Sequence, residues 1–309
     1  MGKCIIKMVN RKFLYIINPI AGTGTAADLE RCIHEEQAKV VFPYAIEYSN
    51  PEGNFQALIH KIKTELFTDI IIGGGDGTVN QVIGALRTLP VQFGIIPVGS
   101  GNGLARAARI PTTTQKAIQF LFETSACPTD GLLVNEKFSC MLSGVGFDGA
   151  VAHSFAKQST RGFFTYCKEV VKQLGKASTY SFTLVIGEKK IKHEAYLISV
   201  ANANQYGNNF TIAPTAKLDD GLLDVVLLGK QSRLQLVVRT ILQLLGANKI
   251  QATDNLNEKA TVLYFQTSSI TILNHESAAA HIDGDPIATT TTLHFQVVPS
   301  AFLLIRNNS

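Results

Sequence analysis

Acidic residues stand inside or beside glycine-rich turns at several points of this 309-residue chain. In the first such turn, Asp76 follows Gly73-Gly74-Gly75 and precedes Gly77-Thr78. Glycine lets a ligand approach the main chain closely, and a helix that begins after the turn points free N–H groups at an anion. A carboxylate among phosphate-binding amides repels phosphate unless it holds a metal or takes a proton. These residue types predict phosphate chemistry in which Asp76 handles a metal or a proton.

A second turn of the same kind follows, Pro97-Val98-Gly99-Ser100-Gly101-Asn102. Neither turn has the Gly-Lys-Ser/Thr ending of a Walker A loop or the Gly-x-Gly-x-x-Gly spacing of a dinucleotide fold. The alternative is a pair of tight strand-to-helix turns without a ligand, because glycine-rich turns are common. The acid and the second turn favour a phosphate site, and Thr78 is expected to cap the helix after the first turn.

Strands and helices alternate through the first part of the chain. Apolar runs predict strands at 13–17, 44–48 and 70–72, and apolar spacing predicts helices over 26–38 and 54–66 and from Val79 onward. Such alternation predicts a parallel sheet with helices on both faces. Ligands bind these sheets at the C-terminal ends of the strands, which is where both glycine turns fall.

The pattern changes near residue 129. Short alternating segments from there to residue 298 predict a mainly antiparallel β-sandwich, interrupted by helical stretches at 149–176 and 231–247. We therefore expect an α/β domain over 1–128 and a β-sandwich domain over 129–298. A last strand within 299–309 is expected to pack back on the first domain.

The composition indicates a globular protein, with 46% hydrophobic and 17% charged residues. The net charge of +4 does not demand nucleic acid and suits a phosphate ligand or an anionic lipid surface. No apolar run approaches the roughly 20 residues of a membrane-spanning helix, and the N-terminus does not resemble a signal peptide. The five cysteines are scattered without a Cys-x-x-Cys pair, which argues against structural zinc and a disulfide framework. A cytoplasmic protein is expected.

The two glycine turns together make the sequence similar to a known family. Gly74-Gly75-Asp76-Gly77-Thr78 with Pro97-Val98-Gly99-Ser100-Gly101-Asn102 resembles the diacylglycerol kinase catalytic domain family. This family includes bacterial lipid kinases and the sphingosine kinases, and the NAD kinases are distant relatives. The resemblance implies that Mg-ATP binds the first domain and that a lipid hydroxyl is phosphorylated in a cleft between the domains. The ATP contacts that it implies are Asn18, Gly22, Ser49, Gly74, Gly75, Asp76, Gly77, Thr78, Asn80, Ser100, Gly101 and Asn102.

Two further acids gain catalytic roles from the resemblance, beside Asp76. Asp130 matches an acid near the metal and the phosphates, although a turn-capping role fits the sequence equally well. Asp285 occupies the place of the glutamate that acts as general base, in Asp283-Gly284-Asp285. Its carboxylate is one methylene (about 1.5 Å) shorter, and base catalysis depends on hydrogen-bond contact. His281 is a second candidate base, and a plain hairpin turn is the alternative for Asp-Gly.

Some positions depart from the family pattern or have ordinary structural explanations. Gln81 stands where many members have glutamate, which removes a charge near the nucleotide. Ser49 by itself reads as a helix cap, and Asp148 after Gly144-Val145-Gly146-Phe147 reads as a helix N-cap. A catalytically weak regulator that binds nucleotide or lipid is therefore one alternative to an enzyme.

The acids Asp219, Asp220 and Asp224 crowd one turn, where they repel one another unless they are solvated or bind a cation. An oxygen cage of this kind suits Mg²⁺ or Ca²⁺. The resemblance implies a structural Mg²⁺ held by the side chain of Asp220 and the carbonyls of Lys217 and Leu222. A solvated acidic hairpin is the alternative.

The function expected from these features is an ATP- and Mg-dependent lipid kinase, peripheral at the inner face of a membrane. Lys168, Lys172 and Lys176 share a helix face that could rest on anionic headgroups, or it is simply solvated. NAD kinase-like phosphorylation is the main rival reaction. The lipid, diacylglycerol or sphingoid or another, cannot be read from the sequence. The oligomeric state is also open, and a homodimer is compatible with the sequence.

Overall fold

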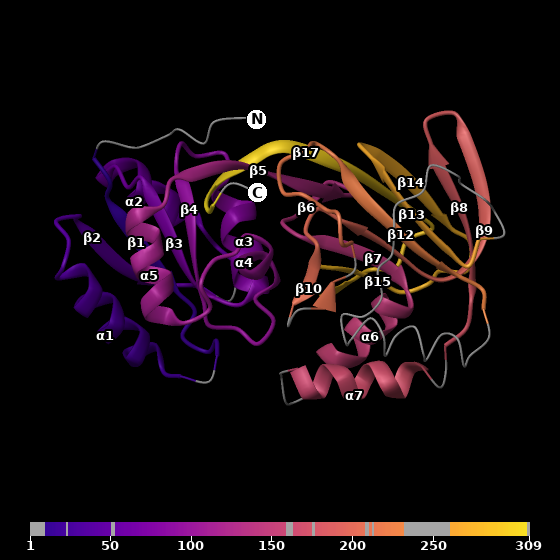
Figure 1. Ribbon diagram of the computed structural model, residues 1–309, viewed down its shortest axis with the longest axis horizontal. Coiled ribbons are helices and arrows are strands. Elements are labelled where there is room, and N and C mark those ends of the chain that lie inside the picture. The colour runs from indigo at the N-terminus through magenta and orange to yellow at the C-terminus, as the bar shows by residue number, and fades with distance from the viewer. Residues whose placement is uncertain are drawn as a thin grey trace. The chain divides into compact units, whose positions relative to one another are not determined.

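The computed structural model describes residues 10–22, 24–50, 53–158, 163–174, 177–207, 210–211, 213–231 and 260–307. The chain divides into two compact units, Met1–Thr129 with Ser300–Ser309, and Asp130–Pro299. Figure 1 shows the elements of each.

The first unit contains a parallel sheet in the order β4-β3-β1-β2. Its strands are β1 (Phe13–Ile17), β2 (Tyr44–Tyr48), β3 (Asp69–Gly74) and β4 (Gln92–Pro97). Every residue of β1, β3 and β4 is buried, which explains why these strands are apolar runs without alternation. The end of β17 (Thr292–Ile305) pairs in parallel with β4 through Leu303 and Leu304. The predicted parallel sheet is confirmed.

Helices connect these strands and place the glycine turns. They are α1 (Ala26–Gln37), α2 (Gln56–Glu65), α3 (Asp76–Leu86), α4 (Gly103–Ala107) and α5 (Thr114–Glu123). The connection from β1 to β2 runs toward one edge of the sheet, and the connections from β2 to β3 and from β3 to β4 run toward the other edge. Because such connections are right-handed, α1 lies on one face of the sheet, and α2 and α3 lie on the opposite face. The strand order therefore reverses between β1 and β3, which is the point where open α/β sheets bind ligands.

The second unit is built mainly from antiparallel pairs. Its central path runs β16-β15-β7-β9-β8-β14-β17, and β12 joins β9 to β13. The strands are β5 (Ala126–Val134), β6 (Lys137–Ser139), β7 (Leu142–Gly146), β8 (Tyr180–Ile186), β9 (Lys189–Ala201), β12 (Leu223–Gly229), β13 (Val262–Thr267), β14 (Ser269–Asn274), β15 (Ala280–Ile282) and β16 (Asp285–Ile287). The short strands β10 (Gln205–Gly207) and β11 (Phe210–Thr211) form a separate pair. The helix expected at 231–247 lies outside the described residues, apart from residue 231.

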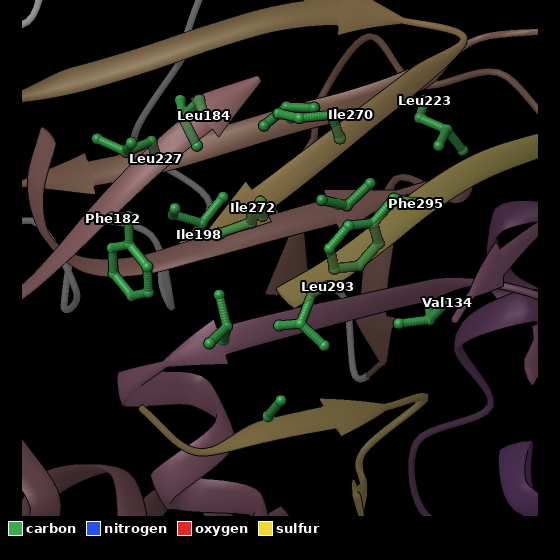
Figure 2. Close-up of a cluster of buried hydrophobic side chains, with 14 of the residues drawn as sticks. Val134, Phe182, Leu184, Ile198, Leu223, Leu227, Ile270, Ile272, Leu293 and Phe295 are labelled. Carbon is green, nitrogen blue, oxygen red and sulfur yellow. The ribbon is translucent and has the colours of Figure 1, made fainter. Parts of the chain in front are cut away.

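Alternating side chains of these strands fill the core of the second unit, which Figure 2 shows in part. In β14 every second residue is buried, and the first half of β17 follows the same period. One face of each strand therefore points into a shared apolar cluster. Its labelled members are Val134, Phe182, Leu184, Ile198, Leu223, Leu227, Ile270, Ile272, Leu293 and Phe295.

The predicted helical stretch 149–176 contains two helices, α6 (Phe147–Ala156) and α7 (Phe163–Leu174). Lys168 and Lys172 are exposed on α7, and Lys172 lies 3.5 Å from the buried carboxylate of Glu169. Lys176, the third member of the expected basic face, lies outside the described residues. Within the described parts of the chain, no helix is long and apolar enough to cross a membrane.

The structure describes the state of three of the cysteines. Cys32 and Cys140 carry free thiols, whereas Cys127 takes part in a disulfide bond. The scattered cysteine spacing, which argued against a disulfide framework, contained no signal for a bond at Cys127.

A buried carboxylate ties α1 to α5 in the first unit. Glu36 accepts hydrogen bonds from Lys39 at 2.6 Å, from Gln115 at 2.8 Å and from Gln119 at 3.0 Å. The bond from Lys39, followed by those from Gln119 and Gln115, lowers the pKa of Glu36 from 4.5 to about 2. The ionised form is thus the form that holds the two helices together.

Replacement of Glu36 tests this tie through its pH dependence. Because its pKa is depressed on folding, Glu36 stabilises the protein fully above pH 4.5 and loses this effect as the pH falls toward about 2. We expect Glu36→Gln to lower the free energy of unfolding by about 1.5–3 kcal/mol at neutral pH. In urea titrations the difference from wild type should shrink below about pH 5.

The neighbouring exposed Glu35 supplies a matched control, since its side chain is 64% exposed and lies 4.0 Å from Arg31. Glu35→Gln should change stability by less than about 0.5 kcal/mol. If the difference in the free energy of unfolding between wild type and Glu36→Gln stays constant down to about pH 3, the ionised carboxylate of Glu36 does not hold α1 to α5.

Candidate active site

The loops after β1 and β3 meet at the reversal point of the parallel sheet. The N–H of Asn18 donates to the carbonyl of Gly73 at 2.9 Å, and its Nδ2 donates to Thr78 Oγ1 at 2.8 Å. Gly22 has φ +83°, and a Cβ there would lie 2.4 Å from the carbonyl oxygen of Val98. The structure thus brings Asn18, Gly22 and Thr78, three expected nucleotide contacts, to the glycine turns.

The two glycine turns lie against each other backbone to backbone. A Cβ built on Gly99 would lie 2.5 Å from Gly75 Cα and 2.9 Å from Asn102 Oδ1. Val98 N–H also reaches the carbonyl of Gly74 at 3.3 Å. Asn102 adopts the left-handed region, with φ 53°, and donates to the carbonyl of Gly99 at 2.6 Å. The main chains of both turns therefore form one surface without intervening side chains.

The helix after the first turn begins at Asp76, and Gly75 is its N-cap. No side chain caps it, so the expectation that Thr78 performs this role is wrong. Thr78 lies inside the helix, where its Oγ1 accepts from Asn18. The N–H groups of the first turn of α3 have no carbonyl partner within the helix, which makes this end suited to an anion.

The remaining expected contacts surround this helix end. Asp76 is half-buried, and its Oδ1 lies 3.4 Å from the N–H of Leu104. Asn80 is half-buried and Ser100 is exposed. The departure at Gln81 is exposed on the same helix. An acid in the first helical turn is also favoured by the helix dipole, so Asp76 has a structural as well as a chemical reason to be there.

Ser49 lies at the end of β2 and lines a cavity of about 240 Å³ between β2 and α2. Its N–H donates to the carbonyl of Ile17 at 2.8 Å. Helix α2 begins at Gln56 with Phe55 as N-cap, so the alternative of Ser49 as a helix cap is wrong. Lys61 and Glu47, joined at 2.6 Å, also line the cavity. A pocket lined by both polar and apolar side chains therefore opens beside β1, the strand that directly precedes Asn18.

In the second unit, Asp130 is held by the acidic loop. Its Oδ2 accepts the N–H of Gly221 at 2.7 Å, and its own N–H donates to the carbonyl of Leu218 at 2.7 Å. Its side chain is buried, and its carbonyl accepts from Asn202 Nδ2. Asp130 is thus integrated into the loop that carries the predicted metal ligands, an association that the sequence did not indicate.

The three acids of that loop occupy different environments. Asp219 is exposed, Asp220 is half-buried, and Asp224 is fully buried on β12. Burial raises the pKa of Asp224, although Tyr264 donates to its Oδ1 at 2.5 Å. Burial also raises the pKa of Asp220, and the nearby charge of Asp130 adds to this effect. The alternative of a solvated hairpin therefore fails for Asp224, whereas Asp219 is exposed as that alternative expects.

The expected metal ligands were one carboxylate and two carbonyls. Asp220 Oδ1 accepts the N–H of Leu222 at 3.1 Å, and Lys217 is exposed beside it. In the part of the chain that the structure describes, no three His, Cys, Asp or Glu side chains are grouped as metal ligands. The expected site consists of one carboxylate and two main-chain carbonyls, so it is not a cluster of three such side chains. The assignment of Lys217, Asp220 and Leu222 as metal ligands stays a prediction.

The hairpin β15–β16 separates the two acids of Asp283-Gly284-Asp285. Asp283 and Gly284 both have positive φ, 48° and 86°, as in a two-residue hairpin turn. Asp283 turns inward and accepts from Ser139 Oγ at 2.8 Å and from Leu142 N–H at 2.9 Å. Asp285, the predicted base, is exposed at the start of β16. The hairpin alternative and the catalytic expectation are therefore compatible.

His281 is buried on β15 and is engaged by two other elements. Its Nδ1 accepts the N–H of Gly284 at 3.2 Å, and its Nε2 lies 3.3 Å from Asp148 Oδ2. Gly146, with φ 102°, is the N-cap of α6, so the expectation that Asp148 caps this helix is wrong. Asp148 lies in the first turn and faces His281 instead. A side chain in these contacts is poorly placed to deprotonate a substrate.

Comparison with known families agrees with this architecture. The model described as "Diacylglycerol kinase catalytic domain" matches residues 12–134. The model described as "YegS C-terminal NAD kinase beta sandwich-like domain" matches residues 142–306. The two matches follow the two units, and the second confirms the predicted β-sandwich.

Individual proteins show the same relationship. An uncharacterized protein of Synechocystis sp. is 27% identical over 94% of this chain and 69% of its own length. A Shewanella frigidimarina protein named "Probable lipid kinase YegS-like" is 25% identical over 76% of this chain and 75% of its own. The crystal structure of a diacylglycerol kinase from Bacillus anthracis str. Sterne shares the fold, with a TM-score of 0.71 and 22% identity over 97% of this chain and 98% of that one. From its glycine turns to its C-terminal sandwich, this chain belongs to the diacylglycerol kinase catalytic domain family of phosphotransferases with an alcohol acceptor.

Proposed function

We propose that the protein is a lipid kinase that transfers the γ-phosphoryl group of Mg-ATP to the hydroxyl of a diacylglycerol or sphingoid lipid. The observation that carries this proposal is the contact between the two glycine turns, where Gly99 approaches Gly75 too closely for any Cβ. Together with the uncapped end of α3, this contact offers a polyphosphate two stretches of bare main chain. Family membership supports phosphoryl transfer as the use of this surface.

The residues around the turns fit a bound nucleotide. Asn18 and Thr78 hold the loop after β1 against α3, and Gly22 keeps that loop close to Val98. We assign the phosphates to the N–H groups of residues 74–80 and to Ser100, Gly101 and Asn102. Ser49 and its pocket are assigned to the nucleoside end.

Carboxylates of both units complete the assignment. Asp76 and Asp130 are proposed to hold the Mg²⁺ that accompanies the nucleotide, and this ion would supply the positive charge that phosphoryl transfer requires. Lys217, Asp220 and Leu222 are assigned to a second, structural Mg²⁺. Asp220 and Leu222 lie in one loop, where Asp220 Oδ1 accepts the N–H of Leu222 at 3.1 Å, and an oxygen-rich loop of this kind suits Mg²⁺.

Asp285 is proposed as the general base. It is exposed, whereas Asp283 is committed to Ser139 and Leu142. Its carboxylate would accept the proton of the lipid hydroxyl as the oxygen attacks the phosphorus. The acceptor is proposed to come from a membrane surface at which the protein is peripheral, and exposed Lys168 and Lys172 suit anionic headgroups.

A kinase assay with a panel of acceptors tests the function. Labelled Mg-ATP is supplied with micelles of 1,2-dioleoylglycerol, sphingosine or phosphatidylglycerol, or with NAD. We expect label in a lipid and none in NAD. Asp285→Asn should lower kcat by about 10²–10⁴-fold, because it removes the base, whereas Asp285→Glu should retain most activity. Asp76→Asn should lower it by about 10²-fold or more.

Asp219→Asn is the matched control for charge removal, since Asp219 is an exposed acid outside the assigned residues. Label in NAD alone contradicts the lipid assignment and supports the NAD kinase alternative. If the protein binds ATP but transfers no label to any acceptor, the result supports the alternative of a catalytically weak regulator that binds nucleotide or lipid.

The glycine contact makes a separate prediction about nucleotide binding. Gly99→Ala forces a methyl group within 2.5 Å of Gly75 Cα, so the two turns must separate. We expect the dissociation constant for Mg-ATP, measured by calorimetry, to rise by at least about tenfold, which corresponds to about 1.4 kcal/mol. Gly24→Ala is the matched control, because a Cβ there meets nothing within 4 Å. Unchanged affinity in Gly99→Ala would remove the turns from the phosphate site.

A further inference from the structure

The turn that carries Asp285 is anchored from the side of Asp283. The carboxylate of Asp283 accepts Ser139 Oγ at 2.8 Å and the N–H groups of residues 140–142 at 2.9–3.2 Å. Its own N–H donates to the carbonyl of Leu142 at 2.9 Å. These bonds fix the first residue of the turn, but they do not determine how the chain leaves it toward Asp285.

A second anchor acts on the residue between the two acids. The N–H of Gly284 donates to His281 Nδ1 at 3.2 Å, and the histidine side chain is only 2% exposed. Because Nδ1 accepts, the proton of the neutral ring lies on Nε2, which faces Asp148 Oδ2 at 3.3 Å. The carboxylate of Asp148 lies close to Nε2 without the geometry of a hydrogen bond, so its negative charge favours the proton on Nε2 and leaves the lone pair of Nδ1 for Gly284.

The sheet leaves just enough room for this pair. Gly144 lies opposite His281 in the pairing of β7 with β15. A Cβ on Gly144 would lie 2.0 Å from Asp148 Oδ2 and 3.0 Å from His281 Nε2. The absence of a side chain at Gly144 is thus a condition for the contact between the histidine and the aspartate.

We propose that His281, held by Asp148, is a positioning residue for Asp285. The hydrogen bond from Gly284 N–H fixes the peptide between Asp283 and Gly284, inside the two-residue turn, and so constrains the path by which the chain reaches Asp285. This inference rests on the proposed function, in which Asp285 is the base. Aspartate is one methylene shorter than glutamate, so its backbone must be placed more accurately to reach the hydroxyl. A misplacement of about 1 Å can cost 100-fold in rate.

Two isosteric replacements of His281 separate its two contacts. Asparagine places an acceptor oxygen where Nδ1 lies, and glutamine places an amide nitrogen near Nε2 without an acceptor for Gly284. With 1,2-dioleoylglycerol micelles and Mg-ATP, we expect His281→Gln to lower kcat by about 10- to 100-fold with the KM for ATP changed less than about twofold. His281→Asn should retain most of kcat. Equal loss in both variants overturns the proposal.

Gly144→Ala disturbs the same pair without changing either side chain. It should lower kcat as His281→Gln does, and Tm measurements on all variants separate this effect from unfolding. His153→Gln is the matched control, because His153 Nε2 contacts the same strand at the carbonyl of Ala280, 3.2 Å away, but not the turn. Wild-type kcat in a folded Gly144→Ala protein contradicts the proposal.

Two readouts do not depend on activity. Nitrogen NMR of the imidazole should show a proton on Nε2 and none on Nδ1. Amide exchange at Gly284 should be slow in wild type and at least about tenfold faster in folded His281→Gln. If wild type phosphorylates no acceptor, the proposed function fails while these readouts still decide whether the anchor exists. Exchange at Gly284 that is equally fast in wild type and His281→Gln overturns the anchor even in an active enzyme.

Discussion

The close approach of two main chains, at Gly75 and Gly99, is the constraint on which the rest of the first unit depends. It requires β3 and β4 to end at the same level, which their parallel register provides by pairing Gly74 with Pro97. It also requires the loop after β1 to lie beside both turns. The bonds of Asn18 hold this loop to the first turn, and the close approach of Gly22 to Val98 brings it to the second. Buried strands thus bring three separate loops to one point, and glycine removes the side chains that would cover it.

In the second unit, hydrogen bonds hold several carboxylates in fixed positions. Asp130 is held by Gly221, Asp283 by the N–H groups of residues 140–142, and Asp220 by Leu222. A main-chain N–H group donates to the carboxylate in each case, so the geometry depends on loop conformation. Asp285 differs because it is exposed, and its placement depends on the turn beneath it. This contrast separates the acids that organise loops from the exposed acid that we propose as the base.

Much of this arrangement was predictable because it depends on local pattern. The strands at 13–17 and 44–48 and the first helices follow from apolar spacing, and the change near residue 129 marks the passage to antiparallel sheet. The sequence was less informative where the outcome depends on long-range contacts. Thr78 and Asp148 look like caps, but tertiary partners, Asn18 and His281, engage both side chains. Neither the bond from Gly221 to Asp130 nor the disulfide of Cys127 has a signal in residue spacing.

The most direct test of the central claim is hydrogen–deuterium exchange with and without Mg-ATP, read at the level of individual amides. We predict slower exchange at the N–H groups of residues 74–80 and 99–103 when nucleotide is added. The β14–β17 ladder of the second unit should not respond. No change anywhere, or protection confined to segments away from the glycine turns, would contradict the account.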